Sequence, residues 1–107
     1  MRPAPVHVEL LDWESARALA APIRFKVFVE EQKVPEESEI DERDLHCVHA
    51  LARGDDGKAL GTGRLLPDGH IGRMAVLREA RQLGVGSALL TALMDEARRR
   101  GHARAML

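Results

Sequence analysis

The chain has 107 residues, 45% of them hydrophobic and 31% charged, which is typical of a soluble globular protein and leaves room for only one domain. Its 16 Lys and Arg nearly balance its 17 Asp and Glu, so no overall field points to a nucleic acid or membrane partner, and any anion site must be local. A single cysteine, Cys47, excludes an internal disulfide and fits a reducing compartment. Because there is no apolar run near the roughly 20 residues of a membrane span, and no signal-peptide core at the start, we expect a cytoplasmic protein.

Apolar and polar residues alternate over residues 6–11, which predicts a first strand. Asp12 is a candidate N-cap for a helix that begins at Trp13. Pro22 cannot donate its amide, so we expect either a kink there or a fresh helix with Pro22 in its first turn. That second piece should end before Val34-Pro35, because a residue that precedes proline disfavours the helical conformation.

Residues 36–44 (EESEIDERD) form the most acidic block of the chain. The block has two interpretations: a solvated acidic loop, which the charge pattern favours, or a surface that steers a cationic amine into a cleft. Three strands then follow as an antiparallel meander, with tight turns at residues 54–57 and 67–69. We place these strands at residues 45–52, 58–66 and 70–77.

Gly72 lies inside the third of these strands, which indicates a bulge or a close neighbour. Cys47 and His49 share one face of the first strand. They are too few for a zinc site, so no metal is expected. One interpretation of these two residues is a Cys–His nucleophile pair. The favoured interpretation is a buried thiol beside a packed imidazole. Trp13 is interpreted as a helix-packing residue, since no other aromatic residues cluster with it.

Residues 81–86 (RQLGVG) join the last strand to a long amphipathic helix that should end at Gly101. Gly84 and Gly86 allow close approach of the backbone, and the first amides of a helix favour anions. Together with Arg81, the two glycines and the free amides predict a loop that binds a pyrophosphate. The alternative is a turn in which the glycines serve packing alone. The apolar stripe of the helix is expected to follow Leu83, Ser87, Leu90, Met94 and Ala97, widened by Leu89 and Leu93.

These residues together resemble a known family. Residues 81–86, set behind a strand that ends Met74-Ala75-Val76, are similar to the acyl-CoA-binding motif of the GNAT acetyltransferase superfamily. Residues 24–35 (RFKVFVEEQKVP), followed by residues 39–49 and 61–65, resemble its ElaA-like branch. The resemblance covers nearly the whole chain. It implies one incomplete GNAT domain over residues 1–107: an α/β (α+β) fold whose mixed, mostly antiparallel sheet is flanked by helices.

The resemblance also implies an activity, the direct transfer of an acetyl group from acetyl-CoA to an amine of a small molecule or a protein. The amides of Met74, Ala75 and Val76 would contact the pantetheine arm and stabilise the developing oxyanion. Arg81 and the backbone of the next residues would hold the pyrophosphate, namely Gln82, Leu83, Gly84, Val85, Gly86 and Ser87. The candidates for the base that deprotonates the amine are Glu39, Asp41, Asp44 and His49.

In this family a parallel strand, expected here over residues 102–107, leads into a further helix and two strands that supply a tyrosine. This chain has no tyrosine, so we expect a fragment, a truncated protein or a domain completed by another subunit. A homodimer through the bare sheet edge follows from the same expectation. Two alternatives remain: an acyl-homoserine-lactone-synthase-like acyltransferase, which shares the Arg-x-x-Val-Phe helix, and a truncated domain that binds CoA or a partner without turnover.

Overall fold

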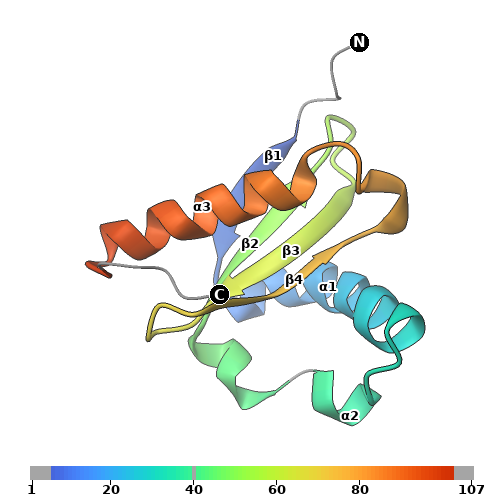
Figure 1. The fold of residues 1–107 in the computed structure, drawn as a ribbon, viewed down its shortest axis with the longest axis horizontal. Helices are drawn as coiled ribbons and strands as arrows, with labels where there is room; N and C mark the ends of the chain where they lie inside the picture. The colour runs from blue at the N-terminus through green and yellow to red at the C-terminus, as the bar shows by residue number, and fades with distance from the viewer. Residues whose placement is uncertain (1–5, 40, 103–107) are drawn as a thin grey trace.

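The computed structural model describes residues 6–39 and 41–102. Four strands form one antiparallel sheet in the order β1-β2-β3-β4, with α3 across one face and α1 across the other (Figure 1). The strands are β1 (His7–Leu11), β2 (Val48–Arg53), β3 (Ala59–Leu65) and β4 (Ile71–Val76). The helical segments are α1 (Trp13–Arg24), η1 (Phe25–Glu31), α2 (Glu36–Glu39), η2 (Glu42–His46), η3 (Arg78–Ala80) and α3 (Val85–Arg99).

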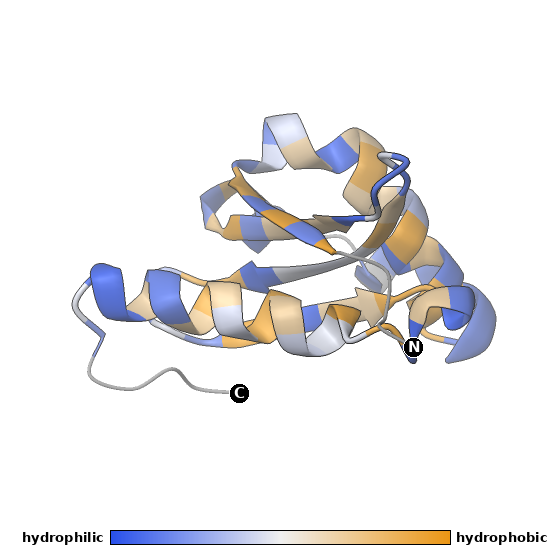
Figure 2. Cartoon of the chain, turned by 90° about the horizontal axis from the view of Figure 1, so that it is seen from above, coloured by the Kyte–Doolittle hydropathy of each residue, from blue (hydrophilic) through white to orange (hydrophobic). Residues whose placement is uncertain are grey.

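Alternation along the central strand divides the core into two layers. Ala50 and Ala52 of β2 face α3 and pack against its buried Leu89 and Leu93. Leu51 points the other way, into a cluster with side chains from α1 and η1. Figure 2 shows hydrophobic residues spread over most of α3 and hydrophilic ones at its C-terminal end. The predicted α+β sheet with helices on both faces is confirmed; the parallel strand predicted over residues 102–107 falls almost wholly outside the described residues.

The start of α1 agrees with its prediction, but its end does not. Asp12 caps the helix by accepting a hydrogen bond from the Ser15 amide at 2.8 Å. No fresh helix begins at Pro22: α1 runs through it to Arg24, and the turns widen to a π-helix only from Phe25. The path stays continuous because the apolar stripe of α1 continues into η1 and packs on one sheet face. The helical path ends before Val34-Pro35, as predicted.

Two further predictions about element boundaries need correction. The strand predicted from residue 45 begins at Val48, because Asp41 and Asp44 form a capping box that winds residues 42–46 into a 3-10 turn. On α3, Ser87 is exposed rather than on the core stripe. The buried row follows the Leu89 and Leu93 side of the predicted stripe; it consists of Val85, Leu89, Leu93, Glu96 and Ala97.

Candidate functional site

The segment between β4 and α3 presents a bare helix N-terminus. Gly84 occupies the N-cap position of α3 with φ 78°, a left-handed conformation that residues with a Cβ rarely adopt. A glycine has no side chain to cap the helix, so the first amides of α3, from Val85 to Ser87, remain available to an outside acceptor. Together with the dipole of a 15-residue helix, these amides favour a bound anion.

The register of β4 decides which of the predicted strand amides can meet a ligand. Ala75 pairs with Thr62, and the Leu77 amide donates to the Leu60 carbonyl at 2.9 Å. Since amide directions alternate along an antiparallel strand, the Ala75 amide faces β3 and the Val76 amide faces the open edge. Among the described residues β4 is an edge strand. Of the three amides implied by the resemblance, that of Ala75 is therefore engaged within the sheet.

Arg81 connects the loop to two other elements. Its Nε donates to the Val76 carbonyl at 3.0 Å, and its Nη2 donates to Glu31 Oε2 of η1 at 2.8 Å. We call the Arg81–Glu31 contact the loop pair. The Arg81 side chain is 41% exposed, and ion pairs this open to water contribute little to stability. The guanidinium can therefore exchange Glu31 for another anion at small cost.

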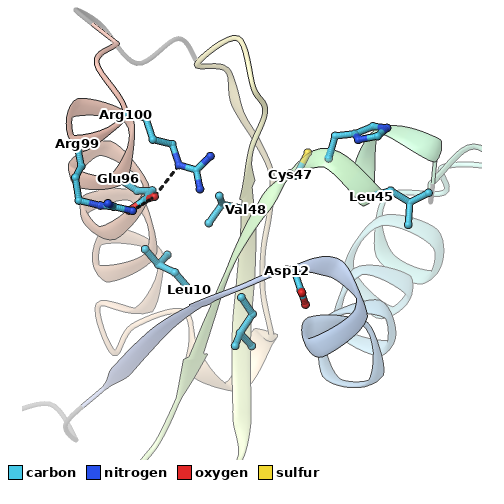
Figure 3. A pocket seen from close by; sticks show the side chains of 10 residues that line it. Leu10, Asp12, Leu45, Cys47, Val48, Glu96, Arg99 and Arg100 are labelled. Carbon is cyan, nitrogen blue, oxygen red and sulfur yellow. Dashed lines mark hydrogen bonds and ion pairs between the residues drawn. The ribbon is translucent and has the colours of Figure 1, made fainter.

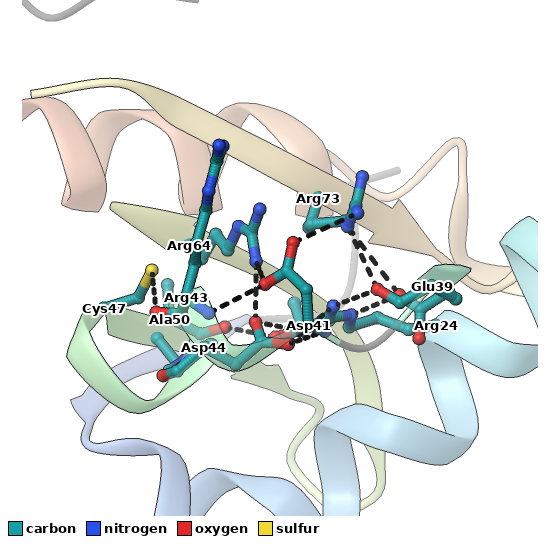
Figure 4. A network of polar contacts seen from close by, with 11 residues as sticks. Arg24, Glu39, Asp41, Arg43, Asp44, Cys47, Ala50, Arg64 and Arg73 are labelled. Atoms are coloured by element: carbon teal, nitrogen blue, oxygen red, sulfur yellow. Dashed lines mark hydrogen bonds and ion pairs between the residues drawn. The ribbon is translucent and has the colours of Figure 1, made fainter. Parts of the chain in front are cut away.

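Three of the four predicted base candidates, Glu39, Asp41 and Asp44, lie elsewhere, in a group of charged residues that we call the inner cluster (Figure 4). Its core is Arg24 of α1, whose Nε donates to Glu39 Oε1 at 2.5 Å and whose Nη1 donates to Asp44 Oδ1 at 2.8 Å. Arg64 of β3 donates to Asp44 Oδ1 at 2.9 Å. The cluster consists of Arg24, Glu39, Asp41, Asp44, Arg64 and Arg73, three positive and three negative side chains.

Burial and pairing make Glu39 and Asp44 unsuited to accept a proton from a substrate. Both are buried, Asp44 with no exposed surface. Burial would raise the pKa of Asp44, but hydrogen bonds and charges from Arg24 and Arg64 outweigh it and hold that pKa below its ordinary value. The arrangement supports a structural role for these carboxylates rather than the role of general base that the resemblance implied. Asp41 is only partly buried, yet it too is held by Arg64, at 3.0 Å.

His49 is also enclosed. Its side chain is 1% exposed, its Nε2 lies 2.9 Å from the Asp44 carbonyl, and its ring packs 4.8 Å from that of Trp13. Burial lowers the pKa of His49, so the ring is neutral near pH 7, and Nε2 is the nitrogen that donates to the carbonyl. A neutral imidazole without access to solvent supports the inner cluster and is not placed to act as a base.

The remaining sequence expectations are resolved by burial. Cys47 is buried and its thiol donates to the Arg43 carbonyl at 3.1 Å; burial raises the pKa of this thiol, which agrees with the favoured interpretation. Trp13 is a packing residue, 5% exposed, with the Arg24 guanidinium 5.3 Å from its ring. The acidic block is not a solvated loop at Glu39 and Asp44.

The arginines of the inner cluster were not among the site residues predicted from the sequence. Arg24 sits beside Ile23 in the apolar stripe of α1, and Arg64 sits beside Leu65 in a strand whose last residues are all buried. An arginine inside an apolar pattern implies a buried carboxylate partner, and the acidic block was the available source. That signal was present in the sequence.

One cavity lies away from the loop. It measures about 370 Å³ and opens between the C-terminal end of α3 and the ends of β1 and β2, near Leu10, Cys47 and Arg100 (Figure 3). A cavity of about 280 Å³, lined by Glu31 of η1 and Arg78 of η3, adjoins the loop pair. Within residues 6–39 and 41–102, no group of His, Cys, Asp and Glu is arranged to hold a metal ion. The helices in this part of the chain are also too short or too polar to cross a membrane.

Comparison with known proteins gives a consistent result. The family model described as acetyltransferase (GNAT) family matches residues 9–107. The uncharacterized N-acetyltransferase YjcF of Bacillus subtilis (strain 168) is 40% identical over 74 residues, which cover 66% of this chain and 52% of YjcF. The chain spans about half the length of the curated relatives that it matches first.

Two solved structures share the fold. An acyl-CoA N-acyltransferase from Pseudomonas aeruginosa superposes with a TM-score of 0.79 at 28% identity, over 94% of this chain and 75% of that one. Escherichia coli ElaA superposes with a TM-score of 0.79 at 23% identity, over 94% and 74%. The likeness to ElaA shows the fold alone.

Proposed function

This chain belongs to the GNAT acetyltransferase family, whose members use acyl-CoA, and on that premise we propose that it transfers an acetyl group from acetyl-CoA to an amine of a small molecule or a protein. The observation that carries the proposal is the N-terminus of α3, where Gly84 leaves the first helical amides uncapped directly after β4. A diphosphate is the part of acetyl-CoA that fits amides and a helix dipole of this kind.

The residues around the loop fit the rest of acetyl-CoA as well. Arg81 can turn from Glu31 to the diphosphate, since its present ion pair is exposed. The outward amide of Val76 would donate a hydrogen bond to the acetyl-bearing end of the bound acetyl-CoA, because no described strand pairs with it at this edge. Bound acetyl-CoA supplies an activated thioester; the chain positions it and presents amides where negative charge develops.

A second candidate function has its own support. The 107 residues contain no tyrosine, the side chain that the family resemblance implied, so a domain that binds CoA or a partner without turnover is the alternative. A homodimer through the bare sheet edge remains a proposal. The cytoplasmic location is proposed because the single cysteine, Cys47, is a free thiol.

The experiment that tests the proposal is thermal unfolding with acetyl-CoA, followed by measurement of CoA thiol release with a panel of amines. We expect acetyl-CoA to raise the Tm by mass action and Arg81→Ala to reduce that rise. Arg98→Ala, which removes an exposed arginine far along α3, is the matched control and should leave it unchanged. An unchanged Tm at saturating acetyl-CoA would refute the proposal; stabilisation without thiol release would favour the non-catalytic alternative.

A further inference from the structure

The hairpin of β3 and β4 contains a β-bulge. Thr62 pairs with Ala75 while Arg64 pairs with Gly72, so two residues of β4, Arg73 and Met74, lie opposite one residue of β3. Arg73 has a φ of 50°, in the left-handed region, which costs a residue with a side chain about 1–2 kcal/mol. Bulges with this conformation at the first position are usually built on glycine. An arginine at this position therefore needs contacts that compensate.

The side chain of Arg73 makes such contacts with the acidic segment beneath the hairpin. Its Nε donates to the Glu39 carbonyl at 3.2 Å. Its Nη2 lies 3.6 Å from Asp41 Oδ2, and the side chain is 33% exposed. Figure 4 shows Arg73 reaching from β4 toward both acidic residues. The bulge is thus tied by its own side chain to a different part of the chain.

The partners of Arg73 are themselves held in place. Arg24 of α1 binds the Glu39 carboxylate and also its carbonyl, the latter at 2.8 Å. Arg64 of β3 binds Asp41 at 3.0 Å, and Asp41 caps the following turn through the Arg43 amide at 3.0 Å. Two neighbouring strands, β3 and β4, therefore each contribute one arginine that binds the same acidic segment. The contact of Arg73 is made to a fixed anchor and not to a loose loop.

The bulge at Arg73 and Met74 lies two residues before the Val76 amide, which faces the open edge. The extra residue shifts the register of β4 so that Ala75 pairs with Thr62, and the amide of the next residue, Val76, therefore points outward. We propose that Arg73 is a positioning residue of the proposed acetyltransferase: its contacts with Glu39 and Asp41 hold the bulge of β4 in the one conformation that aims the outward amide at the acetyl carbonyl. This inference rests on the proposed function. It gives the inner cluster a role in catalysis, which is to hold β4 in position.

The test is the steady-state kinetics of Arg73→Ala, Arg73→Gly and Arg73→Lys with acetyl-CoA and the best amine of the panel. We expect the alanine variant to lose about 100-fold in kcat, the order expected when one oxyanion donor is misplaced. The KM for acetyl-CoA should change less than about threefold, because the diphosphate is bound at the α3 N-terminus. Arg73→Lys keeps the charge and should recover part of the loss. Arg73→Gly removes the backbone strain along with the tether and should be as slow as the alanine variant.

The control is Arg43→Ala, an exposed arginine of the same acidic segment, which should keep the wild-type kcat. NMR spectra of labelled protein provide a readout without turnover. In the wild type, acetyl-CoA should shift the Val76 amide resonance, and in Arg73→Ala that shift should be lost while the Gly86 and Ser87 amides still respond. A wild type that neither binds acetyl-CoA nor turns over overturns the proposed function and this inference together. An active wild type with unchanged kcat and an unchanged Val76 shift in Arg73→Ala overturns the inference alone, as does full activity of Arg73→Gly.

Discussion

The inner cluster and the loop pair are built from the same residue types, arginine and carboxylates, yet they differ in what surrounds them. Arg24 is 1% exposed and binds two buried carboxylates, whereas Arg81 is 41% exposed and binds one carboxylate on the surface. A buried charge that loses its partner costs several kcal/mol, while an exposed one loses almost nothing. The first arrangement therefore fixes the fold, and the second is free to exchange partners with a ligand.

The largest expected effect comes from opening the inner cluster. Arg24→Ala leaves Glu39 and Asp44 buried without their main cation, and we expect a loss of about 3–5 kcal/mol in the free energy of unfolding. Urea denaturation measures this loss. Arg17→Ala, an exposed arginine on the same helix, is the matched control and should change stability by less than about 0.5 kcal/mol. A loss below 1 kcal/mol in Arg24→Ala would show that the cluster is no more structural than the loop pair.

The next effect tests how tightly β3 packs against the start of α3, beneath the proposed anion-binding loop. A Cβ on Gly61 would lie 2.9 Å from Val85 Cγ1 at the start of α3 and 3.0 Å from the Ala75 carbonyl. We expect Gly61→Ala to destabilise the protein by about 1–3 kcal/mol through overpacking. It should also weaken acetyl-CoA binding, because α3 must shift. Gly72→Ala, where a Cβ would have no neighbour within 4 Å, is the control for urea denaturation and calorimetry. Equal stability of the two variants would contradict the packing argument.

A third prediction concerns pH and the burial of His49. Because burial lowers its pKa below the ordinary 6.5, the folded state binds fewer protons than the unfolded state. The stability contribution is complete above pH 6.5 and declines as pH falls from there toward the folded pKa. Asp44 adds a second loss only below about pH 3.8, since its pKa is lowered too.

Urea denaturation at pH 7.5 and pH 5 measures the His49 effect, and we expect the wild type to be less stable at pH 5. His49→Gln should show a smaller difference between the two pH values. His46→Gln, which changes an exposed histidine nearby, should behave as the wild type. A difference that survives in His49→Gln would assign the pH dependence to other groups.

The smallest effect belongs to the loop pair. Glu31→Gln removes the carboxylate that holds Arg81 at 2.8 Å and leaves the guanidinium to the diphosphate. We expect acetyl-CoA affinity to rise by a factor of about 1.4 to 5, which corresponds to the roughly 0.2–1 kcal/mol typical of exposed ion pairs. Isothermal titration calorimetry measures the gain, and Glu30→Gln, on the same turn and more exposed, is the control. A fall in affinity would mean that Glu31 orients Arg81 for the ligand instead of competing with it.

The elements with strong local signals were predictable from the sequence. The tight turns at residues 54–57 and 67–69 located β3 and β4, Asp12 marked the start of α1, and the glycines of residues 81–86 marked the turn into α3. These features depend on neighbours within a few residues, which the sequence displays directly.

The inner cluster could not be assembled in the same way. The hydrogen bonds of its arginines join residues 15 to 34 positions apart. The apolar surroundings of Arg24 and Arg64 indicated buried partners, but the sequence did not show which carboxylate each arginine binds. The strand predicted from residue 45 lost its first three residues for a different, local reason. The capping box of Asp41 and Asp44 forms a turn there, although the residues alternate as in a strand. Nothing in the sequence indicated the positive φ of Arg73. The glycine at position 72 predicted the bulge one residue too early.

The wide spacing of the inner cluster also has a consequence for the time course of folding. Arg24, Glu39, Asp44 and Arg64 meet only after the first helix, the acidic segment and the β3–β4 hairpin have all docked. Contacts that close long loops form late, and interactions absent from the transition state slow unfolding more than they speed folding. We therefore expect the cluster to lengthen the lifetime of the native state, so that resistance to proteolysis depends on it more than the rate of refolding does.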